Sequence, residues 1–178
     1  EVEFPLWIPL WYENLGIFYN FRETKGKKLS TWAYVNEVIR DIKDTSGKIW
    51  IGIWNGSSVY WVWDIISQFF LINDIKNIQE ATGNNMKSSI SNYVRFGDEN
   101  QENRYDTLFS ELISENKNNL DAFSRGDVQM IIWYPRLLEE IAKKWFNKNF
   151  LRAEVFPMNN ENSWNLFINY NYFVINKN

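Results

Sequence analysis

Residues 120–135, LDAFSRGDVQMIIWYP, contain the patterns of a helix, a turn and a strand in direct succession. Residues 120–125 favour a short helix, and Gly126 ends it because glycine readily adopts the left-handed conformation of a helix C-terminus. The apolar run at 128–133 is typical of a buried strand, and Pro135 stands where another helix can begin. This order predicts a fold in which strands and helices intermix.

The remaining strands are expected on both sides of this segment. Residues 15–19 and 48–54 favour strands, and in the second the isoleucines alternate with tryptophan and glycine. The proline-broken aromatic stretch at 7–14 is expected to be a loop that leads into the first of them. Residues 152–156 and 166–175 predict the last two strands.

The other helices are predicted from apolar spacing and from capping residues. One begins at Ser30 or Thr31 and ends at Gly47. Another, capped by Ser57 or Ser58, covers residues 60–70 and is apolar on nearly every side, which is typical of a helix that is buried or flanks a cleft. Three further segments are a polar excursion of short helices at 72–103, a helix over 105–113, and a helix that starts at Pro135.

The composition excludes several classes of function. With 178 residues, no internal repeat and no linker, the chain is expected to form a single domain over residues 1–178. The net charge of −3 disfavours nucleic acid, and no apolar run reaches the ~20 residues of a membrane-spanning helix. Histidine and cysteine are both absent, which removes the usual nucleophile pairs and zinc sites. We therefore expect no metal, no cofactor and no enzymatic chemistry.

The aromatic content of 18% has two interpretations. Large rings fill a core that is otherwise poor in leucine and alanine, or some of them line a surface or cleft. Trp32, Trp63, Trp145 and Phe146 lie on helical stripes and are expected in the core, whereas the two interpretations are evenly balanced for residues such as Trp61.

Arg125-Gly126-Asp127 spells a cell-adhesion tripeptide. A glycine between a helix and a strand is adequately explained by turn geometry, so we assign it no adhesion role.

The order of motifs resembles the second lobe of the family 1 extracellular solute-binding proteins, to which maltose-binding protein belongs. The most specific segment is the "F-x-x-G-x-x-x-M" pattern of Phe123, Gly126 and Met130, which runs into a strand and Pro135. The other matching motifs are Ile8-Pro9, Tyr19-Asn20, Thr31-Trp32, Ile51 to Trp54 followed by Tyr60 to Trp63, Val155-Phe156-Pro157 and Val174-Ile175-Asn176.

The resemblance implies an α/β fold that is one lobe of a type II periplasmic-binding-protein fold, with a mixed sheet flanked by helices. It implies binding of a solute, expected to be a sugar or oligosaccharide, in an aromatic-lined cleft that closes on a missing second lobe. The implied partner is the permease of an ABC transporter. The implied location is extracytoplasmic, with any lipid anchor on a segment outside this sequence.

The resemblance also nominates the residues that line the cleft. The family often has Gly-Pro-Trp where this chain has Tyr134-Pro135-Arg136, so Trp133 or Tyr134 is expected to supply the stacking ring. Arg136 would then bind ligand hydroxyls or pair with a carboxylate. The main candidate ligand-binding residues are Trp11, Tyr12, Glu13, Tyr60, Trp61, Asp64, Trp133, Tyr134, Arg136 and Tyr170.

Two alternatives stay open at this level. A stand-alone carbohydrate-binding or adhesion module would present a flat aromatic strip in place of a concave half-site. A glycoside hydrolase needs two carboxyl groups across a sugar, and Glu13 with Asp64 is the pair the sequence offers.

Overall fold

The structure is a computed structural model that describes residues 6–46, 49–53, 61–77, 79, 83–98, 118–135, 138–144, 149–160 and 168–175. For residues 6–12, 42–46, 49, 95–98 and 168–175 the description covers the backbone.

A four-stranded mixed sheet forms the centre of the body, with the strand order β3-β4-β2-β5. Strand β2 (Gly16–Asn20) pairs antiparallel with β4 (Val128–Trp133) on one side and with β5 (Leu151–Val155) on the other. Strand β3 (Ile49–Ile51) lies parallel to β4 at one edge. All six residues of β4 are buried, as expected for a central strand covered on both faces.

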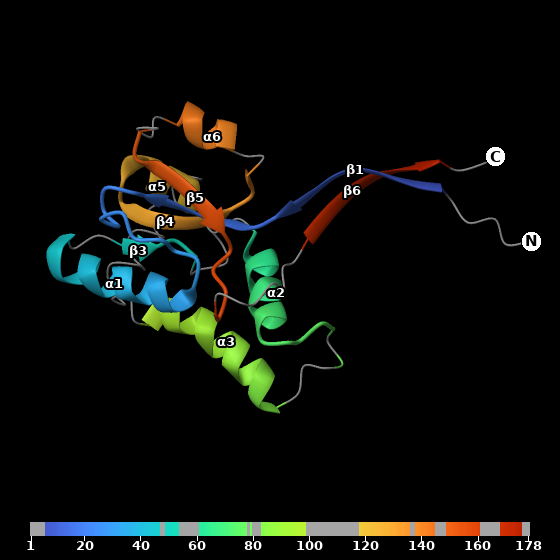
Figure 1. The fold of residues 1–178 in the computed structure, drawn as a ribbon, viewed down its shortest axis with the longest axis horizontal. Helices are drawn as coiled ribbons and strands as arrows, with labels where there is room; N and C mark the ends of the chain where they lie inside the picture. Colours follow the sequence, from blue (N-terminus) through green and yellow to red (C-terminus); the bar gives the residue numbers. More distant parts are fainter. Residues whose placement is uncertain are drawn as a thin grey trace, which may run out of the picture.

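Helices cover this sheet. Helices α1 (Trp32–Ser46) and α3 (Gly83–Asp98) lie on one side of it, and α6 (Leu138–Lys143) lies on the other (Figure 1). Helix α2 (Val62–Ile72) packs against α3. In the core, the ring of Trp32 stacks on Phe69 with centroids 4.9 Å apart and meets Phe156 edge-on at 5.4 Å. The core position expected for Trp32 is therefore confirmed.

A separate two-stranded ribbon extends from the body, and Leu6 and Ile175 pair at its far end (Figure 1). It consists of β1 (Leu6–Asn14) and β6 (Ile168–Ile175), paired antiparallel. The prediction of a loop at 7–14 is wrong, because β6 supplies a partner from the other end of the sequence. Pro9 is tolerated because each ribbon strand pairs on one side only among the described residues, and the register shifts between Pro9 and Trp11.

Other predicted elements differ in length. The expected strand at 48–54 is shorter, since β3 covers Ile49–Ile51. Where the polar segment at 72–103 is described, it contains one long helix, α3, in addition to short turns. Several predictions lie outside the described residues: the end at Gly47, the caps Ser57 and Ser58, the helix at 105–113, and the core positions of Trp145 and Phe146.

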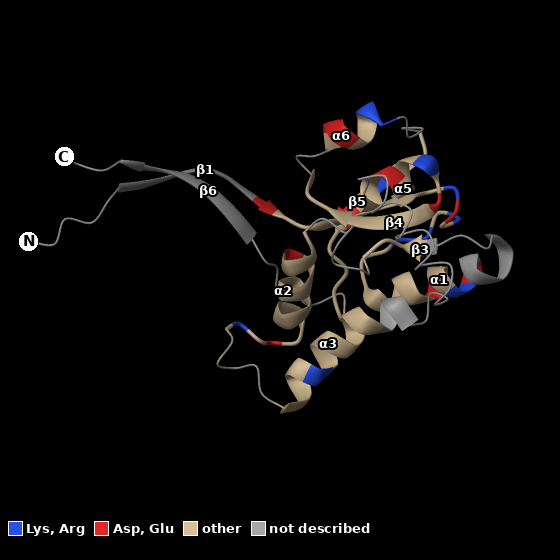
Figure 2. Cartoon of the chain, turned by 180° about the vertical axis from the view of Figure 1, so that it is seen from behind, with Lys and Arg blue, Asp and Glu red and all other residues tan. Residues whose placement is uncertain are grey.

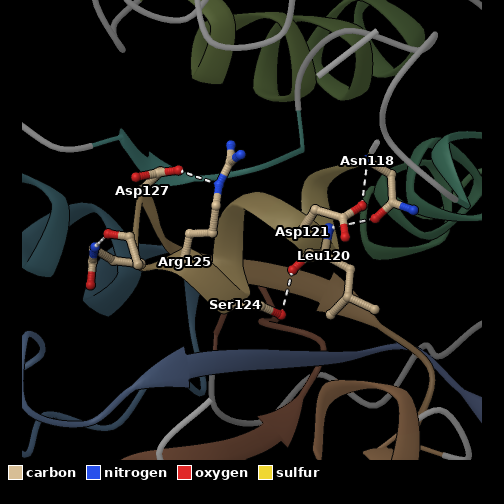
Figure 3. A network of polar contacts seen from close by, with 8 residues as sticks. Asn118, Leu120, Asp121, Ser124, Arg125 and Asp127 are labelled. Atoms are coloured by element: carbon tan, nitrogen blue, oxygen red, sulfur yellow. Dashed lines mark hydrogen bonds and ion pairs between the residues drawn. The ribbon is translucent and has the colours of Figure 1, made fainter. Parts of the chain in front are cut away.

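Helix α5 (Asn119–Arg125) confirms the opening prediction and begins with a capping box (Figure 3). The Asn118 side chain accepts a hydrogen bond of 2.8 Å from the backbone N–H of Leu120. The backbone N–H of Asn118 donates in return to Asp121 Oδ2 at 2.9 Å. These bonds satisfy N-terminal backbone groups that the helix itself leaves unpaired.

The end of α5 explains the Arg-Gly-Asp tripeptide structurally. Gly126 has a φ of 80°, the left-handed conformation of a helix C-cap. Arg125 Nε and Asp127 Oδ2 form an ion pair at 2.8 Å (Figure 3). Gln129 Nε2 donates a hydrogen bond to the Gly126 carbonyl. The three residues thus form the local turn between α5 and β4.

Candidate functional site at the base of the ribbon

Four of the candidate residues meet where α2 begins and β4 ends, and we call them the junction cluster: Trp61, Asp64, Trp133 and Tyr134. The Trp61 ring meets Tyr134 edge-on at 5.1 Å between centroids and Trp133 at 6.4 Å. The Tyr134 hydroxyl donates to Asp64 Oδ2 at 2.8 Å. Asp64 lies in the first turn of α2, where the positive end of the helix dipole favours a carboxylate.

Trp61 has an unusual backbone. As the N-cap residue of α2 it has φ 63° and ψ 22°, the left-handed region that side chains other than glycine rarely adopt. Such a conformation costs on the order of 1–3 kcal/mol and persists where the surroundings hold it. Its ring contacts with Trp133 and Tyr134 are the packing that holds it here.

The base of the ribbon reaches the junction cluster through a short connection. Gly16, the first residue of β2, is the Cα partner of Trp133 and follows Glu13 by three positions. A Cβ on Gly16 would lie 2.8 Å from the Glu154 carbonyl oxygen, so glycine is required for this close approach. Glu13 itself is 9% exposed. The sheet therefore fixes where β1 leaves the body.

The ribbon pairs three further candidates across its two strands. Tyr12 is the Cα partner of Tyr170, and Glu13 is the partner of Asn169. Trp11 stands opposite Asn171. The backbone register therefore places Trp11, Tyr12, Glu13 and Tyr170 in neighbouring backbone pairs toward the body end of the ribbon.

Two predicted contacts lie in the core in this structure. Trp133 and Tyr134 are each 0% exposed, because both faces of β4 are covered and Trp61 packs over its end. Neither ring is exposed in this structure, and both contact the Trp61 ring at the start of α2. Tyr60 and Arg136 lie outside the described residues. The assignment of ligand contacts to the ten candidates stays a prediction.

Trp63 is the residue that the sequence pattern misplaced. It was expected in the core, yet its side chain is 76% exposed. It lies roughly 200° around α2 from Ile65, which is fully buried, so it points away from the core. Because α2 is apolar on nearly every side, apolar spacing alone did not show which face is buried.

The described charges near the site are acidic, whereas the basic candidate Arg136 lies outside the described residues. Glu13 is the acidic residue of β1, and Asp64 is the acidic residue of α2. In Figure 2 the acidic segments of these two elements lie near the place where the ribbon meets the body, whereas the described Lys and Arg residues gather mainly around the sheet and α6.

A cavity of about 440 Å³ lies elsewhere, between α6 and β5. None of the candidate residues is among its described lining, which consists of Leu138, Glu139, Ala142, Leu151, Arg152 and Ala153.

Within the described ranges, no group of three or more acidic residues is arranged to hold a metal ion. Nor does any described helix combine the length and apolarity that crossing a membrane requires.

The sequence matches no protein-family model and no curated protein, so the likenesses are to solved structures. RafE from Streptococcus pneumoniae, solved in its apo form, aligns with a TM-score of 0.64 at 19% identity, over 88% of this chain and 42% of RafE. The GacH receptor of Streptomyces glaucescens, solved unliganded and with acarbose and an acarbose homolog, aligns with a TM-score of 0.58 at 13% identity. That alignment covers 94% of this chain and 43% of GacH.

A third similar structure is the bacterial solute receptor AcbH, described as having an exclusive preference for β-D-galactopyranose. It aligns with a TM-score of 0.59 at 13% identity, over 85% of this chain and 39% of AcbH. At these identities the likeness establishes the fold: a mixed α/β lobe of the periplasmic-binding-protein type, as predicted. The chain spans about two fifths of the length of the structures it matches.

Proposed function

We propose that this chain binds a carbohydrate as one lobe of a two-lobed extracytoplasmic solute receptor that serves an ABC importer. The observation that carries the proposal is the convergence of the ribbon base and the junction cluster in a fold shared with sugar-associated receptors. In such a receptor the ribbon strands continue toward the other lobe, and the ligand lies between the lobes at the hinge.

The physical argument for a sugar rests on the chemistry of the residues at this place. Sugars have apolar C–H faces, which pack on aromatic rings, and hydroxyl edges, which hydrogen-bond to carboxylates and amides. The base of the ribbon combines Trp11, Tyr12 and Tyr170 with Glu13, and α2 adds Asp64. A half-site of this kind binds weakly until the second lobe closes over it.

The receptor role requires no chemistry, so we propose that the protein is not an enzyme. Similarity to binding proteins such as GacH and AcbH supports this reading. The permease partner and an extracytoplasmic location, with any lipid anchor outside these residues, belong to the same proposal.

The test is calorimetric titration of the complete gene product with maltose, maltotriose, galactose and glucosamine, alongside hydrolysis assays with aryl glycosides. We expect saturable binding of at least one sugar and no turnover. Turnover of an aryl glycoside that is lost in both Glu13→Gln and Asp64→Asn would replace the receptor proposal with a glycosidase.

A further inference from the structure

We infer that two copies of this chain associate through the outer edge of β5, which pairs antiparallel with β5 of the second copy about a twofold axis at Ala153. The surface contains none of the candidate ligand residues, and the inference does not depend on the proposed function.

Strand β5 lies at the edge of the four-stranded sheet. It pairs with β2, and among the described residues no strand pairs with its other side. Ala153 is exposed, and Val155 is 46% exposed. An edge strand presents N–H and C=O groups that pair readily with another strand. The outer edge of β5 is therefore suited to a partner strand.

The hydrogen bonds to β2 show which backbone groups of β5 point outward. The Phe21 N–H donates to the Phe150 carbonyl at 2.7 Å, and the Phe156 N–H donates to the Leu15 carbonyl at 3.1 Å. Because hydrogen-bonded and non-hydrogen-bonded pairs alternate in antiparallel strands, the even-numbered residues of β5 bond to β2. The odd-numbered residues within 151–155 therefore direct their N–H and C=O groups to the outer edge.

The sequence of β5, LRAEV, is self-complementary about its centre. When two copies pair antiparallel around Ala153, each Arg152 stands opposite Glu154 of the other copy, and each Leu151 stands opposite Val155. Since Ala153 is one of the outward-bonding residues, this register gives about six backbone hydrogen bonds between the copies. A twofold axis at Arg152 or Glu154 would instead place like charges opposite each other, which is destabilising. The edge thus favours one isologous register.

The two charged side chains are placed for this pairing. Arg152 Nη1 donates to the outward-facing Leu151 carbonyl at 2.8 Å, which holds the guanidinium at the edge. Glu154 accepts the Tyr19 hydroxyl at 2.8 Å and the Leu29 N–H at 3.0 Å. A carboxylate accepts about four hydrogen bonds, so capacity remains for Arg152 of the second copy.

The odd-numbered face of β5 is apolar and partly exposed. Leu138 of α6 lines the cavity there together with Leu151 and Ala153. Leu138 and Val155, each 46% exposed, follow only Trp63 in exposure among the described large hydrophobic residues. Pairing of two β5 strands brings a second apolar row beside this one. Its burial adds to the backbone and charge contacts.

Sedimentation equilibrium of the complete gene product tests the association across about 1 μM to 1 mM, and we expect the average mass to rise from monomer toward dimer. Ala153→Pro removes an outward N–H and leaves the bonds to β2 in place, because proline is tolerated at a sheet edge. It is expected to raise the dimer Kd about tenfold or more. Thermal denaturation checks that each variant is folded.

A charge variant provides an independent test of the same contact. Arg152→Glu places like charges opposite each other in the proposed register and is also expected to weaken the dimer. Lys87→Glu makes the same change of charge at an exposed position of α3, on the other side of the sheet from α6 (Figure 1). It is the matched control and should leave the dimer Kd unchanged.

Cysteine cross-linking tests the register, since residues 1–178 contain no cysteine. In the proposed dimer the two Ala153 Cα atoms lie about 5.5 Å apart, a distance that a disulfide spans. The two Val155 residues are offset by roughly 13 Å along the strands. Under mild oxidation Ala153→Cys should therefore form a covalent dimer, whereas Val155→Cys should not.

A wild-type protein that stays monomeric at about 1 mM overturns the inference, even if the edge pairs with a different protein. So does a dimer that is unaffected by both Ala153→Pro and Arg152→Glu, or cross-linking that is faster through Val155→Cys than through Ala153→Cys. Sugar binding is measured separately, so the receptor proposal stands or fails independently of these results.

Discussion

The hydroxyl of Tyr134 and the carboxylate of Asp64 are joined by a 2.8 Å hydrogen bond across 70 positions of sequence. This bond links the end of the central strand β4 to the first turn of α2. It therefore sets where α2 begins, and with it the position of the exposed ring of Trp63.

Tyr134→Phe removes this hydroxyl from a fully buried position and leaves the ring in place. We expect a loss of about 2 kcal/mol in the free energy of unfolding, because the bond is made to a charged group. Urea denaturation measures this loss of stability as a shift of the unfolding midpoint to a lower urea concentration. Asp64→Asn keeps an acceptor and should lose less; an unchanged midpoint for Tyr134→Phe would show that the bond contributes nothing.

Trp61→Ala deletes the ring that packs against Trp133 and Tyr134 but keeps a Cβ in the left-handed backbone. A loss of about 2–4 kcal/mol is expected from the removed packing. Trp61→Gly, which also removes the backbone strain, should recover about 1 kcal/mol of this loss. Equal stability of the two variants would contradict the role of strain at this residue.

Gly16→Ala tests the close approach at the base of the ribbon. The added Cβ would meet the Glu154 carbonyl at 2.8 Å, so strands β2 and β5 must separate locally. Gly126→Ala is the comparison. Gly126 has a φ of 80°, and a Cβ added there would have no atom within 4 Å. The substitution is therefore expected to lower the free energy of unfolding by about 1 kcal/mol through backbone strain alone. Thermal denaturation should show the larger loss for Gly16→Ala, and the reverse order would contradict this account.

The unfolding free energy is expected to fall at alkaline pH. Burial raises the pKa of Tyr93 from its ordinary value near 10 to about 12, and burial with the Glu154 hydrogen bond raises that of Tyr19. Above pH 10 the unfolded chain loses protons that the folded chain keeps, so the stability present below pH 10 is lost as the pH rises toward 12. The loss reaches at most ~1.4 kcal/mol per pH unit for each group.

Tyr93→Phe removes one of these groups and should flatten the decline between pH 10 and 12, as measured by denaturant titration at each pH. A decline as steep as that of the wild type would show that Tyr93 is not responsible for it.

Elements with local signals could be predicted from the sequence. Helix α5 and β4 have a capping residue, a left-handed glycine and an apolar run within 16 residues, and these features specify both elements without distant partners. The ribbon could not be predicted in this way. Pro9 argues against a strand, and the pairing that overrides it comes from residues 168–175 at the other end of the sequence.

The candidate site, like the fold, could be predicted from the sequence only in part. The motifs nominated Glu13, Trp61 and Asp64, which the structure places around the ribbon base, but they could not show that Trp133 and Tyr134 are fully enclosed. Trp63 was missed because nearly every position of α2 is apolar, so the buried face is decided by contacts with α3 and with the core rings of Trp32 and Phe156.

The central claim is that the ligand binds where the ribbon meets the body. Backbone amide chemical-shift mapping of this chain with millimolar sugar tests it most directly. The account predicts that shifts concentrate at residues 13–16 and at 61–65. Shifts confined to the cavity between α6 and β5, around Leu138 and Arg152, would contradict it.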